Sequence, residues 1–253
     1  MRNATAGPVT PSREPIFNVP AVLLAVLALL VLVHLIRLFA LPADFEVEFL
    51  VLFSFIPVRY DHSLVLGGAL PGGLAAEIWT FFTYALIHAD FAHLGFNAIW
   101  LLAFGTPVGR RFSALRFLAL LAVTAAAGAL AHLITHAGEI MPMVGASASV
   151  SGAMAASMRF AFQRGGPLWS RGNDPQSYLR QALPLRDMLR ERRVLIFIAV
   201  WFAFNFLFGI GSLSVTGETQ SVAWQAHVGG FLAGLFLFDL FDPVPRAPST
   251  PLV

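Results

Sequence analysis

The sequence contains no cysteine and no lysine, and it has few charged residues of any kind. The absence of cysteine excludes disulfides, thiolate metal sites and a thiol nucleophile. Charged residues make up 12% of the 253 residues and hydrophobic residues 57%. A soluble domain typically has roughly 25% charged residues, so this composition favours a protein that resides in a lipid bilayer.

Long apolar runs dominate the chain in place of charge. Six segments have about the length of roughly 20 residues that crosses a bilayer as a helix. Because a spanning segment must satisfy its own backbone hydrogen bonds, we expect each of them to be helical. The predicted fold class is an all-α membrane protein with six transmembrane helices. They cover residues 19–41, 91–108, 115–134, 147–162, 194–210 and 222–241.

The connection between the first two predicted helices, residues 42–90, is too long for an ordinary loop. It contains two apolar stretches, 49–56 and 78–87, which are too short to span a bilayer. We expect this connection to be membrane-associated, with Trp79 and Tyr84 at the level of the lipid headgroups. The predicted organisation is a cytoplasmic segment at 1–18, a six-helix membrane domain at 19–242 and a flexible tail at 243–253.

The arginines predict how the chain is oriented in the membrane. All 16 basic residues are arginines, and a cytoplasmic N-terminus would place all but Arg37 and Arg59 on the cytoplasmic side. The excess of positive charge in cytoplasmic loops therefore predicts that both termini are cytoplasmic. This topological role leaves no case for a nucleic-acid partner. The lysine-free, alanine-rich composition favours a multi-pass protein of a bacterial inner (cytoplasmic) membrane.

Four polar side chains fall near the starts of the predicted helices that begin on the outer side. The second helix carries His93 and Asn97, the fourth begins with Ser147, and the sixth carries His227. At about 1.5 Å of rise per residue, all four lie within roughly 10 Å of the outer helix ends. Since an ionisable residue inside the membrane is a functional candidate, this common depth indicates a site.

A structural role for Ser147 and His227 is the simpler interpretation. A neutral histidine can hydrogen-bond across helices, and serine is common at membrane helix contacts. A catalytic interpretation gains support because Gly230 and Gly234 lie on nearly the same face as His227 and admit a close partner helix. The fourth helix, which begins with small residues, is the expected partner.

A serine and a histidine at such a contact suit the hydrolysis of a peptide bond. The histidine would remove the serine proton, and fixed donors would stabilise the tetrahedral oxyanion. His93 and Asn97 share a helix face and offer an imidazole and an amide, and the Ser147 backbone N–H is unpaired at its helix start. We predict neither a metal site nor a cofactor. Asn205, in the fifth helix, is expected to bond across helices.

Three motifs resemble those of rhomboid intramembrane serine proteases. They are HxxxxHxxxN from His88 to Asn97, the serine segment GASASVSG from Gly145, and HxxGxxxG from His227 to Gly234. They occur in the family's order on the second, fourth and sixth predicted helices. The resemblance therefore implies the six-helix rhomboid fold.

The resemblance also implies roles for individual residues. Ser147 would be the nucleophile and His227 the base of a catalytic dyad that requires no acid. The implied oxyanion hole consists of His93, Asn97 and the Ser147 N–H, and the implied supporting residues are His88, Gly145, Gly230 and Gly234. The partners would be the lipid bilayer and transmembrane protein substrates, which would be cleaved near the outer leaflet where a helix unwinds locally.

Two positions depart from the family's pattern. Ala148 replaces the last glycine of GxSG, and we expect its methyl group at the contact between the fourth and sixth helices. Ser151 stands where some members have a tyrosine beside the base, so another group is expected to orient His227. Asp90 and Glu218, on the outer side, remain open for that role.

Two other functions compete with proteolysis. One is a catalytically silent rhomboid-like protein that binds membrane clients, which would normally have lost the serine or the histidine. The other is a transporter with a histidine relay, which predicts inverted repeats and charged residues at the membrane midplane. The sequence shows neither of these two features.

Overall fold

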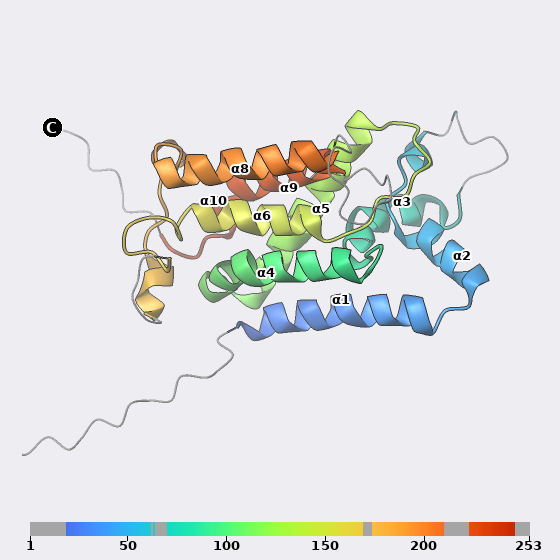
Figure 1. The fold of residues 1–253 in the computed structure, drawn as a ribbon, viewed down its shortest axis with the longest axis horizontal. Coiled ribbons are helices and arrows are strands. Elements are labelled where there is room, and N and C mark those ends of the chain that lie inside the picture. The colour runs from blue at the N-terminus through green and yellow to red at the C-terminus, as the bar shows by residue number, and fades with distance from the viewer. Residues whose placement is uncertain (1–18, 62, 64–69, 169–173, 210–222, 246–253) are drawn as a thin grey trace, which may run out of the picture.

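A computed structural model describes residues 19–61, 63, 70–168, 174–209 and 223–245. These residues form helices and no β-strand, apart from one isolated bridge between Phe55 and Met143. The elements, drawn in Figure 1, are α1 (Ala21–Phe39), α2 (Ala43–Phe53), η1 (Pro57–Tyr60), α3 (Gly73–Thr83), η2 (Tyr84–Leu86), α4 (Phe91–Arg111), α5 (Ala114–Thr135), α6 (Ser147–Met158), η3 (Pro175–Leu179), α7 (Leu185–Met188), α8 (Arg192–Gly209), α9 (Trp224–Phe236) and α10 (Phe238–Phe241).

Each of the six predicted helices overlaps a helix of the structure, namely α1, α4, α5, α6, α8 and α9. The predicted sixth helix is divided at Leu237 into α9 and α10. Among the described residues, three helices (α1, α4 and α5) are long and apolar enough to cross a membrane. The helices α6 and α9 have 12 and 13 residues and are shorter than expected.

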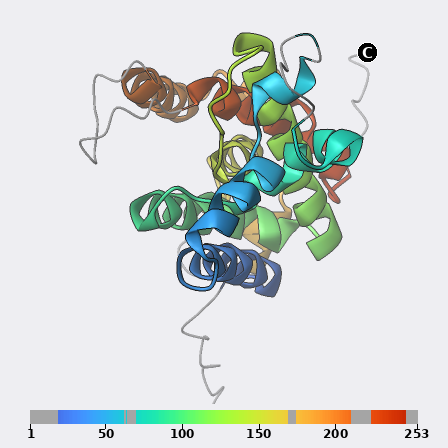
Figure 2. The same cartoon turned by 90° about the vertical axis from the view of Figure 1, so that its right-hand side faces the viewer.

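The helix starts that carry the candidate residues lie at one end of the bundle. Figure 1 shows α4, α6 and α9 beginning at the end where α2 and α3 lie, while α1 begins and α10 ends at the opposite end. Figure 2, which looks along the bundle, shows α6 at the centre and α8 at the outer edge. This arrangement agrees with the predicted topology, in which the second, fourth and sixth helices begin on the same side.

The central helix α6 is enclosed by protein along its length. All of its residues from Ala148 to Met158 are buried, and most of them are alanine, serine or glycine. The small side chains of α6 and two glycines of α9 let the two helices approach closely. A Cβ added to Gly230 of α9 would overlap the Ala148 carbonyl, and one added to Gly234 would overlap the Gly152 carbonyl. Irregular backbone is tolerated at membrane depth where protein covers it, so a short α6 can be flanked by non-helical residues.

The connection between α1 and α4 folds back onto the bundle through α2, η1, α3 and η2. Trp79 is half-buried and donates from Nε1 to the Leu52 carbonyl at 2.9 Å. Tyr84, which was predicted at headgroup level, has its side chain buried inside the bundle. Its hydroxyl donates to the Ala125 carbonyl of α5 at 2.8 Å, which satisfies the polar end of the ring away from water.

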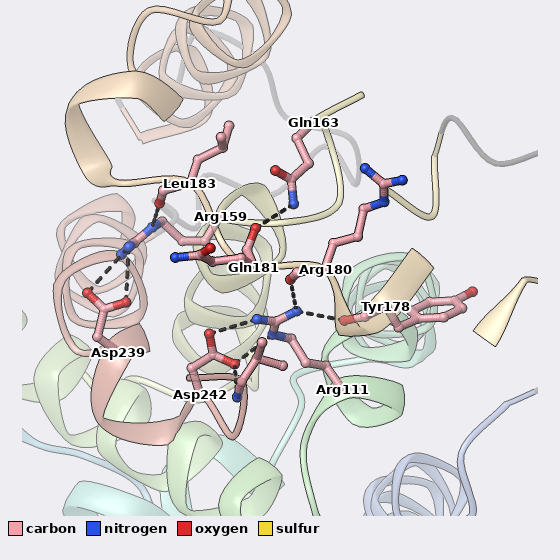
Figure 3. A network of polar contacts seen from close by, with 10 residues as sticks. Arg111, Arg159, Gln163, Tyr178, Arg180, Gln181, Leu183, Asp239 and Asp242 are labelled. Carbon is pink, nitrogen blue, oxygen red and sulfur yellow. Dashed lines mark hydrogen bonds and ion pairs between the residues drawn. The ribbon is translucent and has the colours of Figure 1, made fainter. Parts of the chain in front are cut away.

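At the opposite end of the bundle, two arginines are buried in the fold (Figure 3). Arg111 makes a bidentate pair with Asp242, with both N···O distances 2.7 Å, and its Nη1 donates to two backbone carbonyls. Arg159 pairs with Asp239 at 3.0 Å and donates to the carbonyls of Leu183 and Leu235. These contacts fix α10 against α4 and α6.

The two ion pairs predict different costs of mutation. Asp242→Asn should lower the free energy of unfolding by about 3–5 kcal/mol, because it leaves the fully buried Arg111 guanidinium without its counter-charge. Asp239→Asn is the matched control. Its side chain is 40% exposed, so water can compensate Arg159 in part and the loss should be smaller. Thermal unfolding in detergent measures the loss of stability in both variants. Equal losses would contradict the conclusion that the Arg111–Asp242 pair is the more deeply buried of the two.

Candidate active site

The turn before α6 requires glycine at position 145. Gly145 has a φ of +122° and donates from its N–H to the Tyr84 carbonyl at 3.0 Å. A Cβ there would lie 2.7 Å from Nε2 of His93 and 3.8 Å from Oγ of Ser147. Only glycine suits both the backbone conformation and this close approach. The His93 ring from α4 therefore lies directly over the backbone that leads into Ser147.

His88 also contacts the turn that precedes α6. Its side chain is completely buried, and its Nε2 accepts from the backbone N–H of Ala146 at 3.4 Å. Burial lowers the pKa of His88 to about 3, so the ring is neutral at physiological pH and Nε2 can act as an acceptor. Its ring also contacts the edge of the His93 ring, with centroids 5.1 Å apart.

Ser147 differs from the other serines of α6. The hydroxyls of Ser149, Ser151 and Ser157 donate to the carbonyls of Leu121, Ser147 and Met154 at 2.8, 2.7 and 2.7 Å, and all three side chains are buried. Ser147 is half-buried, and its hydroxyl makes no hydrogen bond to any residue that the structure describes. It is the serine of α6 whose hydroxyl is accessible and uncommitted.

His227 lies on α9, one turn before the glycine that contacts the α6 backbone. Its side chain is half-buried and close enough to His93 for an electrostatic interaction. Within the described part of the chain, its ring hydrogen-bonds to Asn205 of α8 and not to Ser147. Catalytic hydrogen bonds are often long or absent in a free enzyme and tighten when substrate binds.

Two side chains of α4, His93 and Asn97, have defined hydrogen-bond donors. The Ala89 N–H donates to Nδ1 of His93 at 3.4 Å, which leaves the proton of the neutral ring on Nε2, the atom beside Gly145. Asn97 is buried and donates one amide hydrogen to the His93 carbonyl at 3.0 Å, so its second hydrogen remains for another acceptor.

Two acids, Asp90 and Glu218, were candidates to orient His227, and the structure describes one of them, Asp90. Asp90 is the N-cap of α4, and its carboxylate accepts from the His93 N–H at 2.7 Å. Glu218 lies outside the described residues.

Within the residues that the structure describes, no group of three or more His, Asp or Glu side chains is arranged to hold a metal ion.

Comparison with known proteins identifies the family. The family model described as Rhomboid domain matches residues 75–241, which contain α4 to α9 and all the candidate residues above. The chain belongs to the rhomboid family. Its family and its apolar helices make it an integral membrane protein.

Two relatives show how far this rhomboid resembles proteins already described. It is 29% identical over 189 residues to Rhomboid protease GlpG of Enterobacter sp. (strain 638), which covers 74% of this chain and 57% of the relative. It is 28% identical over 164 residues to Rhomboid-related protein 3 of Homo sapiens, which covers 65% of this chain and 36% of the relative. The chain thus spans less than two thirds of the length of either protein.

The rhomboid motif residue Ala148 packs against both α5 and α9. Its backbone carbonyl meets Gly230 of α9, but its methyl group points toward α5, where a Cβ on Gly128 would collide with it. The extra methyl therefore occupies space left by Gly128, where the Ala226 carbonyl of α9 also lies. The sequence carries that compensation, but only the packing of α5 against α6 reveals it.

The sequence analysis did not place Asn205 in the site, although the structure shows it bonded to His227. Bonding of Asn205 across helices was predicted and is confirmed, but its partner was not identified. The available signal was a single amide in a phenylalanine-rich helix. Its partner depends on how α8 is rotated against α9, which the sequence pattern leaves open.

Proposed function

We propose that this rhomboid is an intramembrane serine endopeptidase, which hydrolyses peptide bonds of transmembrane protein substrates near the outer leaflet. The observation that carries the proposal is the uncommitted hydroxyl of Ser147 at the start of α6, beside the Nε2–H of His93. Across the close α6–α9 contact lies His227, a base of suitable type. The name of the bacterial relative describes a protease, which supports the same activity here.

In the proposed reaction, Oγ of Ser147 attacks the carbonyl carbon of the scissile peptide bond while Nε2 of His227 accepts its proton. The oxyanion of the tetrahedral intermediate accepts hydrogen bonds from His93, from Asn97 and from the backbone N–H of Ser147. Collapse of the intermediate breaks the C–N bond, and the imidazolium returns its proton to the departing amine. Water, deprotonated by the same imidazole, then releases the acyl group from Ser147.

The membrane arrangement that we propose has six crossing helices: α1, α4, α5, α6, α8 and α9. The short α6 fits this arrangement because protein encloses it. Both termini would be cytoplasmic, in a bacterial inner membrane, and the site would open toward the outer side. The connection formed by α2 and α3 would lie at the outer membrane surface, and the membrane domain would extend over residues 19–242.

A fluorophosphonate probe tests the nucleophile, and a transmembrane reporter tests the reaction. In a reconstituted bilayer, the protein should cleave the reporter and become labelled at Ser147, because an activated hydroxyl reacts with both. Mass spectrometry identifies the labelled residue. Labelling at Ser149 or Ser151 would contradict the assignment. Reporter binding without cleavage or labelling would instead favour a catalytically silent client-binding protein.

A further inference from the structure

Asn205 is the buried polar residue in an otherwise exposed stretch of α8. It is 8% exposed, whereas its neighbours Phe204 and Phe206 are 53% and 55% exposed. The helix lies at the edge of the bundle beside α9 (Figure 2). A side-chain amide that faced lipid there would have no polar partner, so its position against α9 satisfies it.

The pairing of Asn205 with His227 is set by the packing register of α8 and α9. Trp201 stacks on Phe231 with ring centroids 4.8 Å apart. Asn205 lies four residues after Trp201, and His227 lies four residues before Phe231. Because the two helices run in opposite directions, the amide and the imidazole form the next layer of the same interface. The bond and the stacked aromatic pair are therefore neighbouring layers of one interface, one turn apart.

The second contact of Asn205 determines which end of its amide meets the histidine. Its Nδ2 donates to the Trp201 carbonyl at 2.8 Å, so Oδ1 faces Nδ1 of His227. A flipped amide would bring two acceptors, Oδ1 and the Trp201 carbonyl, into contact. An oxygen acceptor requires a proton on the atom that it meets. His227 therefore carries its proton on Nδ1, and the lone pair of the neutral ring is on Nε2.

We propose that Asn205 is a positioning residue, which holds the His227 ring in the Nδ1–H tautomer with Nε2 free to take the proton of Ser147. This role rests on the proposed protease function. Ser151, at the position where some rhomboids have a tyrosine, donates to the Ser147 carbonyl instead and leaves the imidazole to another partner. An amide orients the ring without adding a charge to an apolar interface.

Two variants separate positioning from packing. Asn205→Ala should lower kcat about 10- to 100-fold with little change in KM, as is typical when a group that orients a histidine through its other nitrogen is lost. Fluorophosphonate labelling of Ser147 should slow in the same ratio. Asn205→Asp should restore the acceptor, and its charge should move the acidic limb of the pH–rate profile upward by about one unit or more. The titratable neighbour of His227 within the described residues is His93, which is the same in every variant.

The control for helix packing is Trp201→Leu, which removes the stacking on Phe231 but keeps the amide. It should lower the unfolding temperature without moving the acidic limb. Independently of activity, nitrogen NMR of labelled histidine in the wild-type protein should report the Nδ1–H tautomer of His227. An Nε2–H tautomer, or an Asn205→Ala variant with unchanged kcat, would overturn the inference. A wild-type protein that neither cleaves nor becomes labelled would refute the proposed function instead.

Discussion

Ser147→Ala should reduce reporter cleavage by at least about 10³-fold, because no other α6 hydroxyl is available to replace the proposed nucleophile. His227→Ala should cause a loss of the same order, since the serine then has no base. Groups that act as one unit are strongly non-additive, so the double variant should be no slower than either single variant. Initial rates of reporter cleavage in proteoliposomes measure all three.

The matched controls for this prediction are Ser149→Ala and Ser151→Ala. Their hydroxyls donate to the backbone carbonyls of Leu121 and Ser147, so their loss should affect helix packing more than turnover. We expect less than about a tenfold change in rate, since each hydrogen bond contributes roughly 1 kcal/mol. Full activity of Ser147→Ala, or a greater loss in Ser151→Ala, would refute the assigned nucleophile.

The sequence predicted where several of the helices begin. The predicted start of the fourth helix at Ser147 and that of the second at residue 91 agree with α6 and α4. These helix starts could be predicted because long apolar runs and the polar residues that begin them are local properties of the chain. The end of α6 could not be predicted in this way, since residues 159–162 are still partly apolar although the helix stops at Met158.

The pair of helices in a contact was predictable where small residues mark it. Gly230 and Gly234 identified the α9 face that meets α6, because close approach needs residues without side chains. The sequence did not indicate that the Ala148 methyl faces Gly128, or that Arg159 pairs with Asp239. Such pairs depend on how each helix is rotated about its axis, which hydropathy does not determine.

Tyr84 illustrates the same limit in the connection between α1 and α4. A tyrosine in a short apolar stretch is typical of the membrane interface, which led to the prediction at headgroup level. Its burial depends on the α5 carbonyl of Ala125, which accepts from the hydroxyl at 2.8 Å. The stretch also contributes the Tyr84 carbonyl that receives the Gly145 N–H, so the connection helps to shape the turn before Ser147.

Gly230→Ala should lower activity about 100-fold or more, because the added methyl would separate the helices that carry the two proposed catalytic groups. The new Cβ would lie 2.7 Å from the Ala148 carbonyl carbon and 2.9 Å from its Cα. These are backbone atoms, so no side-chain rotation relieves the overlap and α9 must move away from α6. A displacement of about 1 Å at reacting groups can cost about 100-fold in rate.

The same chain offers a matched glycine for comparison. Gly95, in α4, has no atom within 4 Å of a Cβ added to it, so Gly95→Ala should retain activity and stability. Thermal unfolding should show a loss of about 1–3 kcal/mol for Gly230→Ala alone. Adding Ala148→Gly to Gly230→Ala should not restore the rate, because the overlap is with the backbone of residue 148 and not with its methyl group. Rescue by that second change would instead mean that the Ala148 side chain sets the distance between α6 and α9.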